Sequence, residues 1–356
     1  MEHKERILYL DVLRVIAIFA VIIFHIAGLP FKGIKDPNFW EMTNMWFCGV
    51  PVFVMISGAL FLNPSREVTI HKLYTKNIFR LISILLFWSV IYACVNLITE
   101  PGQNTITFFR SIVAGHFHLW FLYMLLGLYM IVPVLRPICK DLKLTRYFLV
   151  LFIIFSCLFP TIAQILSGLK LVMPHNMLIP YLINGINSTL YFKMHLHFTL
   201  GYITCFVLGY YMSRAELSSK QRKVIYVLGI LGVLLPIFFV ESITRISKVP
   251  FDFYSGPEKN VFVLFATLAV FVFVKYNAHR LSGQFKKIFT YLASSVLGIY
   301  LTHIFVQICL IKFFNLLNIS FNPLFAIPLI ALIIFIISLI ITEIIKKIPI
   351  LNKYTI

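Results

Sequence analysis

Long apolar runs separated by short basic segments recur along the whole chain, and they are the strongest constraint on its fold. The hydrocarbon core of a bilayer requires about 20 mostly apolar residues per helix, and segmentation at that length predicts about ten spans. The predicted spans cover approximately residues 7–28, 41–62, 79–98, 117–137, 147–167, 197–213, 224–243, 260–277, 289–311 and 324–345. The sequence therefore predicts an all-α, polytopic membrane protein.

The composition excludes most other classes of protein. Of the 356 residues, 60% are hydrophobic and only 12% are charged, whereas an ordinary soluble domain has about 25% charged residues. A soluble fold could not bury this much apolar surface, so intrinsic disorder, a secreted disulfide scaffold and a soluble enzyme are excluded. No polar stretch is long enough to fold alone, and residues 1–356 are expected to form a single transmembrane domain.

Lysines and arginines dominate the charged residues and give a formal net charge of +18. If the N-terminus is cytoplasmic, most of the 31 lysines and arginines fall in segments predicted to face the cytoplasm, as the positive-inside rule requires. Both termini are then predicted to be cytoplasmic. Because these charges lie in short loops and not along one face, the lipid bilayer is the expected partner and nucleic acid is not.

The longest connection predicted on the outer side covers about residues 168–196. It is rich in turn formers and amides, including Pro174, Asn176, Asn184 and Gly185. Two interpretations remain open for this segment. It is either a solvated loop, or a segment that caps the outer face or touches a polar acceptor.

The first span contains charges where a bilayer disfavours them. Each costs roughly 2.5–3.5 kcal/mol on insertion scales, but Asp11 and Arg14 are one helical turn apart and can pair. His25 follows Arg14 within about 20° of three full turns, so both side chains point the same way, about 16 Å apart along the axis. An imidazole suits a general base and a guanidinium suits an anionic group. A buried ion pair that only fixes helix packing is the alternative.

Other polar side chains fall within predicted spans: Ser57, His118, Trp120, Tyr300 and His303. Each could simply hydrogen-bond a neighbouring helix, or lie at the membrane interface in the case of His118 and Trp120. Their recurrence in separate spans makes a purely structural role for all of them less favoured. The six cysteines include no Cys-x-x-Cys pair, and no His-x-x-x-His or similar cluster appears, so no metal is predicted.

Four motifs resemble, in order, those of the acyltransferase-3 family of bacterial membrane acyltransferases. The matching segments are 9–14 with His25 (an Arg-x10-His pattern), 51–58 (ending Ser-Gly), 118–122 with Tyr129 and Pro133 (a His-Leu-Trp-Phe run), and 298–303 (Tyr-x-x-His). Together they extend over most of the chain. Within the family, the sequence is similar to surface-polysaccharide O-acetyltransferases of the enterobacterial common antigen type.

The resemblance implies acyl transfer in the bacterial cytoplasmic membrane, from cytoplasmic acetyl-CoA to a hydroxyl of an envelope glycan or a lipid-linked sugar precursor. His25 would be the catalytic base and Arg14 an essential cation, with His118 and His303 as further catalytic candidates. Asp11, Ser57, Trp120 and Tyr300 would support the substrates. The family often has Arg-x-x-Arg at the start of the third span, and this chain has Asn77-Ile78-Phe79-Arg80. Lys76 could replace the missing arginine, so Arg14, Lys76 and Arg80 are the expected CoA ligands.

Two questions stay open at the level of sequence. The acetyl group could reach the outer side because a channel exposes the thioester to His25, because a residue is transiently acylated, or because the acceptor bends inward. A transporter or exporter of a small molecule or glycan is the alternative function. No pair of Gly/Pro-interrupted spans is evident in equivalent halves of the chain, which weighs against a transporter.

Overall fold

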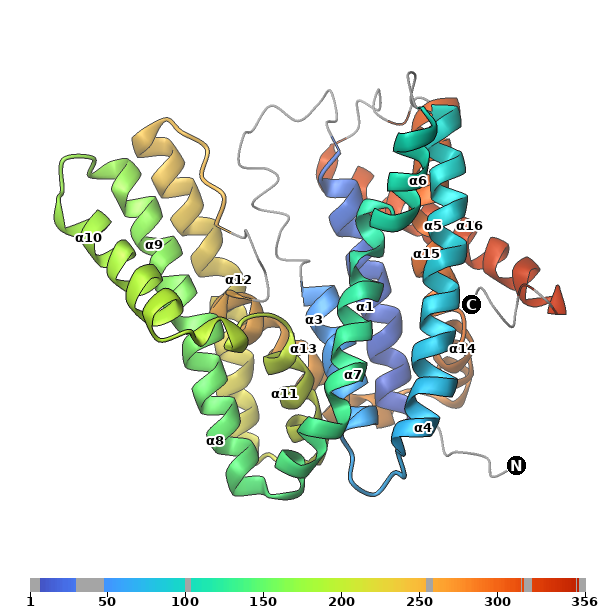
Figure 1. Ribbon diagram of the computed structural model, residues 1–356, viewed down its shortest axis with the longest axis horizontal. Helices are drawn as coiled ribbons and strands as arrows, with labels where there is room; N and C mark the ends of the chain where they lie inside the picture. Colours follow the sequence, from blue (N-terminus) through green and yellow to red (C-terminus); the bar gives the residue numbers. More distant parts are fainter. Residues whose placement is uncertain are drawn as a thin grey trace.

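The computed structural model describes residues 7–29, 48–99, 104–253, 259–314, 316, 322–349 and 351. Most of these residues are helical and none of them forms a strand (Figure 1). Eight helices of the described chain are long and apolar enough to cross a membrane, which confirms an all-α, multi-pass membrane protein. They are Leu8–Ala27, Ile70–Thr99, Thr105–Lys140, Leu142–Val172, Ser219–Ser247, Val261–Arg280, Val296–Phe314 and Phe325–Lys346.

Eight of the predicted spans fall on these eight helices. The second predicted span corresponds to the shorter apolar helix α3 (Gly49–Phe61), while its part at 41–47 lies outside the described residues. The sixth predicted span, 197–213, is wrong in its first part, because helix α11 begins only at Ile203 and ends at Arg214.

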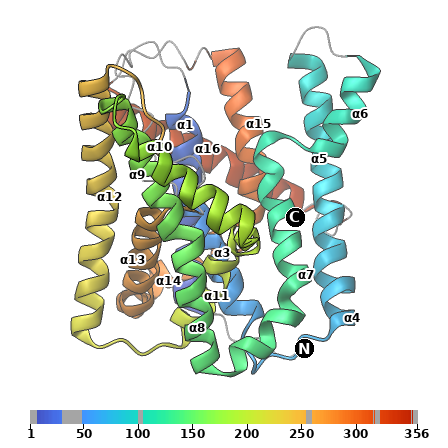
Figure 2. The same ribbon diagram turned by 60° about the vertical axis from the view of Figure 1, so that its left-hand side comes forward.

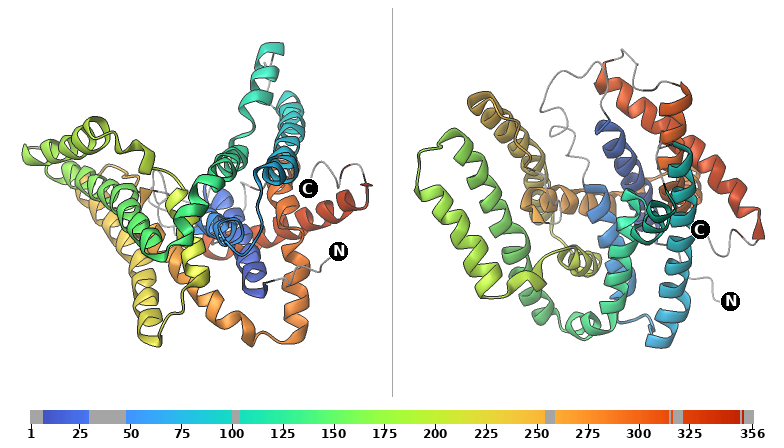
Figure 3. Two further views of the ribbon diagram at one scale, coloured as in Figure 1. Left: turned by 60° about the horizontal axis from the view of Figure 1, so that its bottom comes forward. Right: turned by 45° about the horizontal axis from the view of Figure 1, so that its top comes forward.

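Helix α1 (Leu8–Ala27) lies inside the bundle and is apolar on every side except at a few positions. A helix that is hydrophobic all round must be covered by other helices. Helices α3, α13 (Val261–Asn277), α14 (Gly283–Ala293), α15 (Val296–Phe314) and α16 (Pro323–Lys346) all contact it. Both views in Figure 3 place α1 between α3 and α16. The charged residues of α1 therefore face protein and not lipid.

Helices α3 and α11 approach each other closely at two glycines. A Cβ atom on Gly58 would lie 1.7 Å from the carbonyl oxygen of Phe206, and one on Gly209 would lie 2.0 Å from that of Met55. Small residues permit such backbone contact between membrane helices. The contact fixes α3, which carries Ser57, against α11.

We expect Gly209→Ala to destabilise the protein by about 1–3 kcal/mol, because the methyl group of the alanine would overlap backbone that cannot move aside. The matched control is Gly127→Ala in α7 (Trp120–Lys140), where an added Cβ meets nothing within 4 Å. That change should be neutral or stabilising by up to about 1 kcal/mol, since alanine is the better helix former. Melting temperatures in detergent measure both effects, and equal shifts would contradict the packing described here.

Basic residues that were predicted on one side of the membrane meet at one end of the bundle. Arg136 near the end of α7 donates to the carbonyls of Phe61, Asn63 and Arg66, at and just after the end of α3. Lys275 of α13 donates to the carbonyls of Met212 and Ala215 at the end of α11. We call this end the basic end; it contains α4 (Ile70–Lys72) and the starts of α8 (Leu142–Ile153) and α12 (Ser219–Ser247) (Figure 2). Its assignment to the cytoplasm stays a prediction.

The outer connection predicted at 168–196 is largely helical. Helix α9 (Phe159–Val172) continues through its beginning, and α10 (Leu178–Asn184) leads into a π-helical segment, Gly185–Lys193, that returns toward the middle of the bundle. A short 3-10 turn (Leu196–Thr199) then precedes α11. Residues 178–193 and 203–214 are thus two short helical segments separated by a break at 194–202. We call them the outer and inner halves of the sixth crossing, after the sixth predicted span and its predicted orientation. Most of this segment is therefore helix and not loop.

Candidate active site

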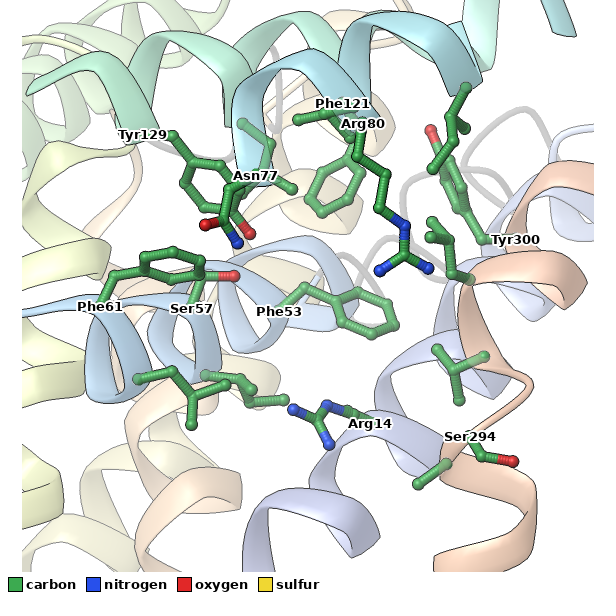
Figure 4. A pocket seen from close by; sticks show the side chains of 18 of the residues that line it. Arg14, Phe53, Ser57, Phe61, Asn77, Arg80, Phe121, Tyr129, Ser294 and Tyr300 are labelled. Atoms are coloured by element: carbon green, nitrogen blue, oxygen red, sulfur yellow. The ribbon is translucent and has the colours of Figure 1, made fainter. Parts of the chain in front are cut away.

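A cavity of about 290 Å³ opens between α1, α3, α5 (Phe79–Thr99), α7 and α15 (Figure 4). Most of its wall is apolar. Its polar lining residues are Arg14, Ser57, Lys76, Asn77, Arg80, Tyr129, Ser294 and Tyr300. A mainly apolar pocket with a few convergent polar groups is the usual form of a small-molecule site.

Three cations line this cavity from different elements. Arg14 reaches in from α1 and Arg80 from α5 on the opposite wall (Figure 4), while Lys76 comes from the π-helical segment Leu73–Ile78 that precedes α5. Arg14 donates from Nη1 to Asp11 Oδ1 at 2.7 Å, which confirms the expected pair. The Asp11 side chain is 2% exposed and that of Arg14 is 29% exposed. The buried carboxylate thus holds a guanidinium whose other edge remains available to the cavity.

A second cavity of about 300 Å³ adjoins the first at the basic end. The two share Leu60, Phe61, Lys76 and Asn77. The second cavity adds Arg66 and Lys72, with Glu67 as its acidic lining residue. Positively charged side chains therefore outnumber negatively charged ones along the path from the basic end into the first cavity.

Four histidines gather beyond Tyr300, toward the end of the bundle opposite the basic end. His303 lies one turn after Tyr300 on α15, and its Nε2 is 3.3 Å from Nδ1 of His25. The rings of His118 and His303 pack edge to face with centroids 5.5 Å apart. His116 Nδ1 lies 2.9 Å from His118 Nδ1. The structure thus brings together residues from α1, α15 and the short turn before α7.

The hydrogen bonds assign the tautomers of His25 and His303. His303 Nδ1 lies 2.5 Å from the carbonyl oxygen of Tyr300 and must donate to it, so its Nε2 carries the lone pair when the ring is neutral. His25 Nδ1 lies 2.9 Å from the carbonyl oxygen of Val21 and donates likewise. The same Nδ1–H of His25 can also be donated to Nε2 of His303. Nε2 of His25 is then the atom that can accept a proton, which is what a general base requires.

Two buried tyrosines hold the histidine cluster in place. Tyr300 donates its hydroxyl to the carbonyl oxygen of His118. Tyr92 of α5 stacks on His116 with centroids 4.6 Å apart and donates to the carbonyl oxygen of Leu301 at 2.7 Å. His118 is 1% exposed, and its Nε2 makes no hydrogen bond within the described chain. No group of three or more His, Cys, Asp or Glu with the geometry to hold a metal ion occurs among the described residues.

The predicted site residues therefore fall into three groups. Arg14, Ser57, Lys76, Arg80 and Tyr300 line the cavity, and Asp11 pairs with Arg14 behind its wall. His25, His118 and His303 form the histidine cluster beyond Tyr300. Trp120 lies apart from both and contacts Tyr202, with ring centroids 5.8 Å apart.

Sequence reasoning missed His116 and Tyr92. His116 stands two residues before His118, and that spacing was the available signal because both rings can converge where the chain is not yet α-helical. Tyr92 gives no comparable signal, since a tyrosine within an apolar span is unremarkable on its own.

Comparison with known proteins agrees with the motifs. The model of the acyltransferase domain family, acyltransferase-3, matches residues 7–343. No curated protein and no solved structure matches the chain. Because the family model extends over nearly the whole sequence, this multi-pass membrane protein belongs to the acyltransferase-3 family and is an acyltransferase.

Proposed function

We propose that the protein transfers an acetyl group from cytoplasmic acetyl-CoA to a hydroxyl of an envelope glycan or lipid-linked sugar, in the bacterial cytoplasmic membrane. One observation carries the proposal. The cavity lined by Arg14, Lys76 and Arg80 ends at Tyr300, one helical turn from His303 and its partner His25. A donor that enters from the basic end would have its reactive end next to a base.

The charges of the two cavities fit the donor. CoA carries several phosphate groups, and guanidinium and ammonium groups are their usual partners. Arg66, Lys72 and Lys76 would hold phosphates in the outer cavity, while the thioester arm extends past Arg80 into the largely apolar inner one. Lys76 and Asn77 both line the cavity, which supports Lys76 as replacement for the arginine that the family pattern lacks.

The reaction needs one proton acceptor on the acceptor side. His25 Nε2 would take the proton of the acceptor hydroxyl as its oxygen attacks the acetyl carbonyl. The new C–O ester bond forms, the C–S bond breaks, and CoA leaves as a thiolate that then takes up the proton held by His25. Enclosure by the helices keeps out water that would otherwise hydrolyse the thioester. Among the three routes considered for the acetyl group, the cavity favours a channel that exposes the thioester to His25.

We expect Arg80→Gln to weaken acetyl-CoA binding by about 1.5–3 kcal/mol, roughly 10- to 150-fold in Kd, because a charge-assisted hydrogen bond to phosphate is lost. Titration calorimetry on the purified protein in detergent measures the change. The control is Lys223→Gln, an exposed cation of α12 at the same end of the bundle that lines neither cavity. Equal affinity of the Arg80 variant and the unaltered protein would place the donor elsewhere.

The proposed activity is tested by incubating the purified protein with acetyl-labelled acetyl-CoA and envelope glycan fractions. Label should become ester-linked to a glycan and be released by mild base. A transporter would instead move a solute across the membrane of a proteoliposome without covalent transfer, and absence of transfer with every fraction would favour that function.

A further inference from the structure

The break in the sixth crossing lies near the middle of the membrane-spanning bundle. Tyr191, just before it, donates its hydroxyl to the carbonyl oxygen of Phe155. Thr204, just after it, hydrogen-bonds Ser156 at 2.8 Å. Phe155 and Ser156 lie in the π-helical middle of the Leu142–Val172 span, within three residues of the midpoint of its charge-free stretch 147–169. Residues 194–202 are therefore held at mid-span depth from both sides (Figure 1).

The backbone at this depth leaves the helical conformation. His195 adopts a left-handed conformation with φ 53°, and Gly201 has φ 96°. In a bilayer, irregular backbone is tolerated only where protein buries it or where it lines a water-filled space. Discontinuous helices of this kind mark binding sites in other membrane proteins.

Three exposed polar side chains occur at the break. Lys193, His195 and His197 are all exposed in the fold, next to exposed Phe192 and Phe198. An exposed cation at mid-span would cost several kcal/mol if it faced hydrocarbon. Water or a polar ligand is the environment that these three side chains require.

An aromatic pair connects the break to the start of α7. Tyr202, the last residue of the break, packs beside Trp120 with ring planes 32° apart. Trp120 is 43% exposed and follows His118 by two residues at the start of α7. Sugar sites commonly combine an aromatic side chain, which packs on the C–H groups of the sugar ring, with polar side chains that hydrogen-bond the sugar hydroxyls.

We propose that the break in the sixth crossing is the acceptor subsite: a water-accessible space open to the outer side, where Lys193, His195 and His197 hydrogen-bond a sugar and the exposed ring of Trp120, held by the buried Tyr202, packs against it. The proposal rests on the proposed acyl transfer to a glycan, and it assigns the acceptor to residues separate from the donor cavity. The sugar hydroxyl would approach His25 from the outer side while the thioester arrives from the basic end.

Accessibility is tested first, because it does not depend on catalysis. Single cysteines at His195, His197 and, as control, Leu234 are placed in a folded variant whose six native cysteines are replaced. Leu234 is an exposed apolar residue near the middle of α12. A charged, membrane-impermeant methanethiosulfonate is added to the outside of intact cells. Because only the thiolate reacts, we expect His195→Cys and His197→Cys to be labelled at least tenfold faster than Leu234→Cys. Equal rates would overturn the proposal.

The second measurement concerns binding of the acceptor. The triple variant of Lys193, His195 and His197, each changed to Gln, should raise the apparent KM for the accepting envelope glycan fraction at least tenfold and leave the KM for acetyl-CoA unchanged. Lys170→Gln, an exposed cation at the outer end of α9, is the control and should change neither. An unchanged glycan KM, or an equal rise in both KM values, would overturn the acceptor subsite. If no fraction accepts acetyl, the proposed function fails, while the labelling result still decides whether the space exists.

Discussion

Replacing His25 by glutamine is expected to reduce the turnover of acyl transfer roughly 10²–10⁴-fold, the range for removal of a general base. Glutamine keeps a similar size and can still hydrogen-bond near Val21 and His303, but its amide cannot accept a proton at neutral pH. Single-turnover transfer of labelled acetyl measures the effect. Acetyl-CoA affinity should stay unchanged, because His25 does not line the donor cavity.

A matched control separates catalysis from a general effect of losing an imidazole. His175→Gln changes an exposed histidine of the outer connection and should leave turnover as it is. Near-normal transfer by the His25→Gln protein would refute His25 as the base. In that case His303 and His118, its neighbours in the cluster, become the candidate bases, and His303→Gln and His118→Gln test them in the same assay.

Arg14→Ala is expected to lower both stability and activity. It leaves the buried Asp11 carboxylate without its guanidinium, and loss of one partner of a buried ion pair costs about 3–5 kcal/mol. It also removes one of the cations that line the donor cavity. The melting temperature in detergent and the Kd for acetyl-CoA measure the two consequences separately.

Two further variants distinguish the roles of Arg14. The double variant Asp11→Asn with Arg14→Ala removes the stranded charge and should recover much of the melting temperature, while acetyl-CoA binding remains weak. Arg14→Lys keeps the charge but lacks the planar fork that can bind Asp11 and a second anion together. It should restore stability more than binding. Full recovery of acetyl-CoA affinity in the double variant would reduce Arg14 to a packing role.

The helices and much of the cavity lining were predictable because membrane insertion imposes a strong, local pattern. Apolar length marks most of the spans, and the cost of a charge at bilayer depth singles out Asp11 and Arg14. The motif residues Ser57, Arg80 and Tyr300 then converge on one cavity, although they are far apart in sequence. A local sequence pattern does not tell which of these residues line the cavity and which, like His25, lie beyond it.

The sixth crossing shows where local pattern fails. Asn184, Gly185 and Asn187 favour turns, and this composition predicts a loop. The segment is nevertheless helical, because it packs along α9 and Tyr191 bonds a carbonyl in the π-helical middle of the neighbouring span. Such tertiary contacts have no counterpart in a sequence window. The same holds for His116, whose position depends on stacking against Tyr92 from another helix.

The glycine contact between α3 and α11 has a mechanical consequence. Backbone lies directly on backbone at Gly58 and Gly209, so the inner half of the sixth crossing moves as one body with the wall that carries Ser57. The outer half is fastened to α9 instead. Any relative motion of the two halves must be absorbed by residues 194–202, where His195 and Gly201 already occupy left-handed conformations. Such a motion would turn about one point, because Tyr191 and Thr204 bond the adjacent residues Phe155 and Ser156.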